Sequence, residues 1–237
     1  MSDAIVIIPT YNEIENIERM TRTVLGFDKD FHLLFIDDNS PDGTAEKIIE
    51  LQKEFPNRLF IERRSGKLGL GTAYIHGFKW AINKNYAFIF EMDCDFSHNP
   101  NDLIRLYNSC VNEKADVSIG SRYCKGGKVE NWPLKRILMS YFASLYVRCI
   151  LWIGIKDTTA GFKCYRTEVL RKINLEGITF KGYAFQICMK YAALKHGFKI
   201  KEVPITFIDR QYGTSKMSTG IFKEALFGVW KMRKMEL

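Results

Sequence analysis

Two aspartates stand one residue apart directly after a short apolar run. Asp93, Cys94 and Asp95 follow the segment 88–92, which reads Phe-Ile-Phe-Glu-Met. In an extended chain, side chains two positions apart project to the same side, so the two carboxylates could share a divalent ion. Mg²⁺ and Mn²⁺ prefer oxygen ligands and commonly bind one or two carboxylates together with substrate phosphates. A solvated acidic strand end would show the same pattern, so the pair alone does not decide between the two interpretations.

Two further apolar runs end in polar clusters. Residues 4–8 are followed by Pro-Thr-Tyr-Asn-Glu at 9–13, and residues 32–36 by Asp-Asp-Asn-Ser-Pro-Asp-Gly-Thr at 37–44. The Pro-Asp-Gly part of the second cluster would by itself be a turn. Two adjacent aspartates at the tip of an apolar strand are harder to explain as a turn, and charged groups at such a position favour a ligand.

Short apolar runs alternate with segments of helical period, which predicts an α/β fold with a mostly parallel central sheet flanked by helices. The expected strands are 4–9, 32–37, 59–63, 86–93 and 116–122, followed later by 162–166 and 203–208. Asn12 with Glu15 has the spacing of a capping box that would begin the first helix. Ligands bind at the carboxyl ends of the strands in such a sheet, which is where the polar clusters fall.

A long helix is expected over 134–154, with a broad apolar face. Its polar positions recur every four residues and are Arg136, Ser140, Ser144 and Arg148. The uncharged run 137–147 is too short to cross a bilayer, which needs about 20 residues. The helix would therefore lie in a membrane interface or pack in a core or oligomer contact. A last amphipathic helix, about 221–237, repeats the pattern, although its terminal cations could simply complement the helix dipole.

Composition limits the class of protein. The formal net charge of +8 favours anionic partners such as nucleic acid, phosphorylated small molecules or a membrane surface. Nucleic acid is not expected, because there is no zinc finger, RNP-like strand or basic recognition helix. The six cysteines form no C-x-x-C pair and are expected to be reduced thiols in a cytoplasmic protein. The N-terminus lacks the pattern of a secretory signal peptide, so export is not expected.

A known family shares five ordered motifs with this chain. They are P-T-Y-N-E (9–13), D-D-N-S-P-D-G-T (37–44), M-D-C-D-F-S-H (92–98), G-S-R-Y (120–123) and D-R-Q-Y-G-T-S-K (209–216). In this order they resemble the family 2 glycosyltransferases, and among them the mannosyltransferases that act on dolichyl-type polyprenyl phosphates. The resemblance also includes T-A-G-F-K-C-Y-R (159–166) and G-Y-A-F-Q (182–186) and covers nearly the whole chain.

The resemblance implies a GT-A (Rossmann-like) fold, GDP-mannose as donor, Mg²⁺ or Mn²⁺ as cofactor, inversion at the sugar carbon and a polyprenyl monophosphate as acceptor. We expect residues 1–237 to form one domain. About 1–122 would be the nucleotide-sugar-binding half, and about 123–237 the acceptor-binding half with membrane-facing helices. The protein would associate peripherally with the cytoplasmic face of a membrane, through its own surface or an anchoring partner, and its oligomeric state stays open.

The resemblance also implies roles for individual residues. The nucleoside would be held by Pro9, Tyr11, Glu13, Ile36 and Asp38. The diphosphate and metal would meet Asp93, Cys94 and Asp95, with Asp93 and Asp95 as metal ligands. Positive charge around the phosphates would come from Arg122, Arg210 and Lys216, which with Asp95 are the candidate catalytic residues. Arg136 is added from its position as a second cation for the acceptor phosphate.

One position departs from the family pattern. Ser97 stands two residues after the second acid, where many relatives have glutamine. A serine hydroxyl is a shorter and weaker metal ligand, so the third protein ligand is either Ser97 or replaced by water.

A hydroxyl acceptor would need a general base. A lipid monophosphate would not, because its second pKa is about 6 by analogy with phosphorylated side chains.

Three alternatives stay open on the residues alone. Another family 2 enzyme could use UDP-glucose or a related donor, with a polyprenyl phosphate or a glycan as acceptor. The absence of the Q-x-x-R-W signature argues against a processive polysaccharide synthase. A nucleotidyltransferase would usually place a Gly-rich loop where residues 9–13 stand, and a membrane-binding module without catalysis would not need the acidic and basic residues above.

Overall fold

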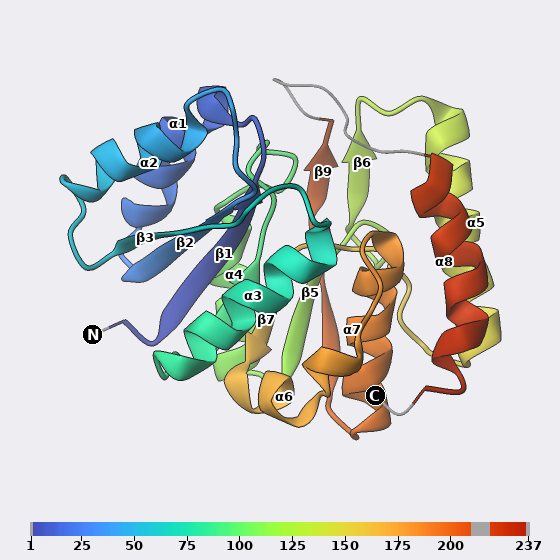
Figure 1. Ribbon diagram of the computed structural model, residues 1–237. Coiled ribbons are helices and arrows are strands. Elements are labelled where there is room, and N and C mark those ends of the chain that lie inside the picture. The colour runs from blue at the N-terminus through green and yellow to red at the C-terminus, as the bar shows by residue number, and fades with distance from the viewer. Residues whose placement is uncertain (1, 210–218, 236–237) are drawn as a thin grey trace.

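The protein is described by a computed structural model, which covers residues 2–209 and 219–235 (Figure 1). Its main sheet has seven strands in the order β3-β2-β1-β4-β7-β5-β8. These strands are β1 (Ala4–Thr10), β2 (Phe31–Asp37), β3 (Leu59–Arg63), β4 (Phe88–Glu91), β5 (Val117–Ser121), β7 (Lys163–Arg166) and β8 (Ile200–Pro204). Every neighbouring pair is parallel except those of β7, which runs antiparallel to β4 and β5. The predicted mostly parallel sheet is confirmed.

Helices cover both faces of the sheet. They are α1 (Ile14–Leu25), α2 (Thr44–Gln52), α3 (Leu70–Asn83), α4 (Asp102–Val111), α5 (Leu134–Leu151), α6 (Thr167–Lys172), α7 (Tyr183–Lys195) and α8 (Thr219–Met232), with a 3₁₀ turn at Leu175–Gly177. Because side chains alternate along a strand, Ile5 and Ile7 of β1 pack with α3 and α7, whereas Val6 and Ile8 pack with α1, α2 and α4.

The second half of the chain completes the sheet that the first half begins. Strand β7 lies between β4 and β5, and β8 pairs with β5 at the edge. The run predicted as one strand over 203–208 is divided: β8 ends at Pro204, Ile205 is buried, and β9 (Thr206–Ile208) pairs with β6 (Lys128–Glu130) in a separate two-stranded sheet. The two halves therefore share one sheet.

Two local predictions at the strand ends are wrong. Asn12 adopts a positive φ of 55°, and no side chain caps α1, so there is no capping box. The backbone amides of Asn12 and Glu13 instead donate to Ser40 Oγ and Thr44 Oγ1 of the neighbouring polar cluster, each at 3.0 Å. Strand β4 ends at Glu91, so Asp93 and Asp95 lie on a bent loop in which Phe96 has a φ of 59°, rather than on an extended strand.

Helices α5 and α8 lie side by side at the edge of the molecule, away from β3 (Figure 1). Trp230 Nε1 of α8 donates to Tyr146 Oη of α5 at 2.9 Å. The buried residues of α5 are Ser144, Val147 and Leu151, so part of its polar stripe faces the protein while Phe142 is 58% exposed. None of the helices within residues 2–209 and 219–235 has the length and apolar character needed to cross a bilayer.

Candidate active site

A cavity of about 520 Å³ opens at the carboxyl ends of β1, β2 and β4. We call it the donor cavity. The predicted residues that line it are Pro9, Tyr11, Glu13, Asp38, Asp93, Cys94 and Asp95. Lys67, Leu70, Lys181 and Tyr183 line it as well, with Lys67 Nζ 5.1 Å from the centre of the Tyr11 ring. Ile36 lies in the core beneath the sheet edge, where it is fully buried.

The two adjacent aspartates after β2 differ in their surroundings. Asp37 is fully buried and accepts hydrogen bonds from Thr10 and from the amide and hydroxyl of Ser40, so it closes the turn. Asp38 borders the donor cavity, and its Oδ1 lies 2.6 Å from Nε and 2.5 Å from Nη2 of Arg64. Burial raises the pKa of Asp38, although the Arg64 guanidinium opposes this shift.

The loop after β4 holds its two carboxylates differently. The Asp93 side chain is 41% exposed, whereas Asp95 is buried. Ser97 donates to Asp95 Oδ1 from its amide at 3.1 Å and from its hydroxyl at 2.6 Å. Ser97 therefore orients Asp95. Among the residues that the structure describes, no three His, Cys, Asp or Glu side chains come together as a metal site would need. Two oxygen-donating carboxylates do fit a cation that completes its shell with phosphate and water.

His98 packs against this loop and forms a hydrogen bond with its backbone. Its Nδ1 accepts a hydrogen bond of 3.3 Å from the Asp93 amide. The ring stacks on Phe162 with centroids 5.0 Å apart and meets the edge of Phe207. Burial lowers the pKa of His98 to about 4, so the ring is neutral at physiological pH and its Nδ1 can accept the hydrogen bond from the Asp93 amide.

A smaller cavity of about 110 Å³, the central cavity, adjoins the donor cavity. Asp93, Asp95 and Tyr183 line both cavities. Arg122, Arg136 and Asp209 line the central cavity as well. The central cavity thus brings carboxylates and guanidinium groups together in one lining.

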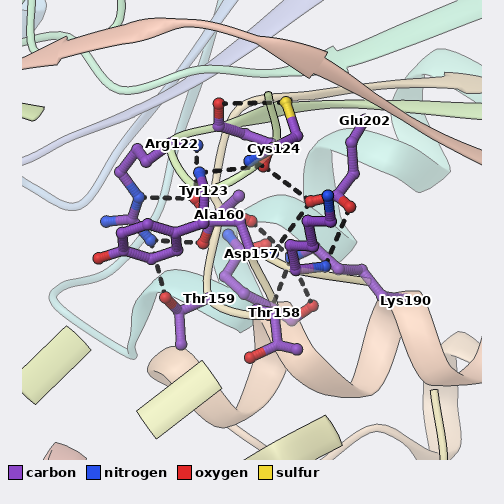
Figure 2. A network of polar contacts seen from close by, with 12 residues as sticks. Arg122, Tyr123, Cys124, Asp157, Thr158, Thr159, Ala160, Lys190 and Glu202 are labelled. Carbon is purple, nitrogen blue, oxygen red and sulfur yellow. Dashed lines mark hydrogen bonds and ion pairs between the residues drawn. The ribbon is translucent and has the colours of Figure 1, made fainter. Parts of the chain in front are cut away.

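Arg122 follows β5 and is held along one edge of its guanidinium (Figure 2). Asp157 accepts from its Nε at 2.7 Å and from its Nη2 at 2.6 Å, and Thr159 Oγ1 lies 2.8 Å from Nη2. Burial alone would lower the pKa of Arg122, but the charge of Asp157 outweighs it and raises that pKa. Within the described part of the chain, Nη1 has no hydrogen-bond partner.

Arg136 stands on the first turn of α5. Its guanidinium carbon lies 3.8 Å from the centre of the Trp132 ring, and Nη1 lies 3.1 Å from Asp209 Oδ2. The same ring is 5.6 Å from the guanidinium carbon of Arg122. The Trp132 ring therefore lies within cation–π distance of both guanidinium groups.

A third cavity of about 350 Å³, the apolar cavity, leads from the two arginines along α5 to α8. Its apolar lining includes Met139, Phe142, Ala143, Tyr146, Val147, Ile187 and Leu226. Arg122, Trp132 and Arg136 line both this cavity and the central one. Tyr183, at the first position of α7, lines all three cavities.

Two predicted residues, Arg210 and Lys216, lie outside the described residues. The sequence interpretation had assigned no role to several side chains that border the three cavities or hold the predicted residues. They are Arg64, Lys67, His98, Asp157, Thr159 and Tyr183. His98, Thr159 and Tyr183 belong to motifs that carried the resemblance, and that membership was the one available signal.

Solved structures with this arrangement are glycosyltransferases of the GT-A fold. Glucosyl-3-phosphoglycerate synthase from Mycobacterium tuberculosis, in complex with Mn²⁺, UDP and phosphoglyceric acid, aligns with a TM-score of 0.71 at 14% identity and covers 97% of this chain and 78% of that one. The same enzyme with Mn²⁺, UDP-glucose and glycerol 3-phosphate aligns with a TM-score of 0.68 at 15% identity over 99% of this chain and 81% of that one. These likenesses establish the fold.

The sequence establishes the family. The model of glycosyl transferase family 2 matches residues 5–174, and the chain belongs to this family. It is similar to a polyprenol monophosphomannose synthase from Mycolicibacterium smegmatis, with 46% identity over 97% of this chain and 87% of that protein. It is also similar to an undecaprenyl-phosphate mannosyltransferase from Micrococcus luteus, with 43% identity over 95% of this chain and 91% of that protein.

Proposed function

We propose that this chain transfers mannose from GDP-mannose to a polyprenyl monophosphate, with inversion at the sugar carbon. One observation carries the proposal: a cavity with acidic and basic side chains at the strand ends, a smaller cavity lined by Arg122 and Arg136, and an apolar cavity adjoin one another, and Tyr183 lines all three. A sugar nucleotide, a phosphate and a lipid chain need surroundings of these three kinds, in this order. The names of the two relatives at 43% and 46% identity support the same reaction.

The first half of the chain, about 1–122, would bind the donor. Pro9, Tyr11, Glu13 and Asp38 border the donor cavity where a nucleoside would lie, with Ile36 beneath them. Asp93 and Asp95 would hold Mg²⁺ or Mn²⁺ together with the diphosphate, and Cys94 would contact the diphosphate. When bound, the metal neutralises charge on the departing GDP. Arg210 and Lys216 are proposed to assist at the same phosphates.

The second half, about 123–237, would bind the acceptor. Arg122 is fixed along its Nε and Nη2 edge, so its Nη1 edge is the part that would meet a phosphate oxygen. Arg136 forms a partly exposed ion pair with Asp209, and it would release Asp209 to bind the phosphate instead. The acceptor phosphate is already a dianion at neutral pH, so its oxygen can attack the sugar carbon without a general base.

The lipid would extend along α5 into the apolar cavity. We define the outer apolar face by Leu138, Tyr141, Phe142 and Leu145 of α5 with Phe227 and Trp230 of α8, all of them exposed. Val147 and Leu151 of α5 are buried on its other side, so α5 carries apolar side chains both toward the protein and toward solvent. The exposed apolar side chains suit a helix that lies against lipid, and they support peripheral association with the cytoplasmic face of a membrane. An anchoring partner or a second copy could strengthen that association.

Radiolabelled donors test this function. The protein is incubated with Mg²⁺ or Mn²⁺, farnesyl phosphate and either GDP-[¹⁴C]mannose or UDP-[¹⁴C]glucose, and label that partitions into an organic phase is counted. We expect lipid-linked label from GDP-mannose. Label from UDP-glucose alone would replace the proposed donor, and no lipid-linked label from either donor would contradict the reaction.

A further inference from the structure

The loop 157–160, between α5 and β7, carries both groups that hold Arg122 (Figure 2). Asp157 binds Nε and Nη2 of Arg122, and its Oδ2 also accepts from the Arg122 amide at 2.9 Å. Thr159 Oγ1 accepts from Nη2. The direction of the Arg122 guanidinium is therefore set by the position of this loop, which we call the arginine-holding loop.

Glu202 of β8 fastens the beginning of the arginine-holding loop. Its Oε1 accepts from the Asp157 amide at 3.0 Å and from Ser121 Oγ at 2.7 Å, while its Oε2 accepts from the Lys156 amide at 3.0 Å. Ser121 is the last residue of β5, directly before Arg122. Glu202 thus joins the loop to the strand from which Arg122 projects.

Lys190 of α7 holds the rest of the loop (Figure 2). Its side chain is buried, and its Nζ lies 3.1 Å from the Thr158 carbonyl, 2.6 Å from the Ala160 carbonyl and 3.2 Å from the Gln186 carbonyl. An ammonium group has three N–H donors, which match these three acceptors. Within the described residues Lys190 forms no ion pair with a carboxylate, so the backbone carbonyls replace the water that burial removes.

We propose that Lys190 is a positioning residue of the acceptor site, which acts through the arginine-holding loop to aim the Nη1 edge of Arg122 into the central cavity. The inference rests on the proposed function, in which Arg122 binds the acceptor phosphate. A lysine that merely stabilised the fold would change the melting temperature and the active fraction. A positioning lysine also changes the affinity for the phosphate while leaving nucleotide binding intact, because none of the three residues that Lys190 Nζ contacts lines the donor cavity.

The test compares Lys190→Met with wild type and with Lys195→Met, an exposed lysine of the same helix. Circular dichroism checks folding, calorimetry with GDP and Mn²⁺ measures the donor site, and calorimetry with farnesyl phosphate measures the acceptor site. We expect Lys190→Met to bind farnesyl phosphate roughly tenfold more weakly, with GDP binding within about twofold of wild type. Lys195→Met should match wild type in both. If Lys190→Met does not fold, Lys190→Gln, which keeps two N–H donors, is measured under the same criteria.

A double-mutant cycle tests the route through Arg122. In an Arg122→Met background, Lys190→Met should cause no further loss of farnesyl phosphate affinity, because the group it positions is gone. Unchanged affinity in the single variant, or an equal loss in both backgrounds, would overturn the inference. If wild-type protein itself bound no farnesyl phosphate and transferred no sugar to it, the proposed function would fail instead, so the two failures are distinguishable.

Discussion

Asp157 accepts three hydrogen bonds from Arg122, one from the backbone amide and two from the guanidinium, and both side chains are buried. Asp157 binds the Nε and Nη2 edge of the Arg122 guanidinium, so the Nη1 edge is directed away from Asp157. An arginine held in this way loses little freedom when it binds a second anion, so the arrangement favours recognition of a phosphate.

Replacing Asp157 with asparagine should destabilise the protein strongly, because it leaves the buried Arg122 charge without its counter-ion. Breaking a buried ion pair on one side costs about 3–5 kcal/mol. Urea denaturation at pH 7 measures the free energy of unfolding, with Glu113→Gln, which breaks an exposed pair with Lys201, as the control. A loss for Asp157→Asn no larger than that of the control would contradict this account of the pair.

The same variant gives a pH prediction. Burial alone would raise the pKa of Asp157, but Arg122 outweighs it and lowers that pKa below the ordinary value of 3.8. A group whose pKa is lower in the folded than in the unfolded state contributes its full stabilisation above the unfolded pKa. This stabilisation is lost as the pH falls through the folded-state pKa. The stability difference between wild type and Asp157→Asn should therefore be constant from pH 5 to 8 and shrink below about pH 4. A difference that already shrinks between pH 7 and 5 would be inconsistent with this direction.

Asp95 should be indispensable and Ser97 should not. Asp95→Asn should lower kcat/KM by roughly 100-fold or more, because it removes one of the two carboxylates proposed to hold the metal and the diphosphate. Ser97→Ala removes only the 2.6 Å hydrogen bond to Asp95 and should cost less than about tenfold. EDTA should abolish transfer, and added Mg²⁺ or Mn²⁺ should restore it. Full activity in EDTA would exclude the proposed metal role of Asp93 and Asp95.

Arg136→Ala should weaken the apparent affinity for polyprenyl phosphate by roughly tenfold, because a charge-assisted hydrogen bond to phosphate is lost. The KM for GDP-mannose should stay within about twofold of wild type. Lys135→Ala, an exposed neighbour on the same turn, is the matched control. If the two substitutions raised the acceptor KM equally, Arg136 would contribute only to the overall positive charge of the surface and would not bind the phosphate specifically.

The outer apolar face should bind membranes. Phe142 is 58% and Phe227 is 75% exposed, so Phe142→Ser with Phe227→Ser removes two large apolar groups from that face. We expect vesicle binding in a flotation assay to fall at least about tenfold, since burying one such side chain contributes roughly 1.5–3 kcal/mol. Ile49→Ser, at an exposed apolar position on α2, should leave it unchanged. Vesicle binding that is retained in the double variant would contradict peripheral docking through α5 and α8.

The fold and the donor cavity were largely predictable from the sequence. Apolar runs that alternate with helices predict parallel strands, whose carboxyl ends meet at one edge of the sheet. Tyr11, Asp38 and Asp95 were therefore expected to lie close together at that edge. They line one cavity there. The antiparallel insertion of β7 was not predicted, because a buried strand has the same pattern in either direction. The loop geometry of Asp93 and Asp95 was missed because a short apolar run does not reveal where extended backbone ends.

The acceptor side was less predictable. Arg122 and Arg136 were proposed, but Asp157, Thr159 and Tyr183 come from loops and helix ends whose meeting depends on tertiary packing. Lys190 has the residue type of a solvated surface charge, and only the three carbonyls around its Nζ distinguish it.

The most direct test follows the acceptor phosphorus. Farnesyl phosphate, GDP-mannose, Mn²⁺ and the protein are incubated, the metal is removed with EDTA, and ³¹P NMR is recorded. The account predicts that the phosphomonoester resonance of farnesyl phosphate is replaced by a phosphodiester resonance while an equal amount of GDP forms. GDP formation with an unchanged phosphomonoester resonance would mean that water, and not the lipid phosphate, accepts the sugar, and would contradict the central claim.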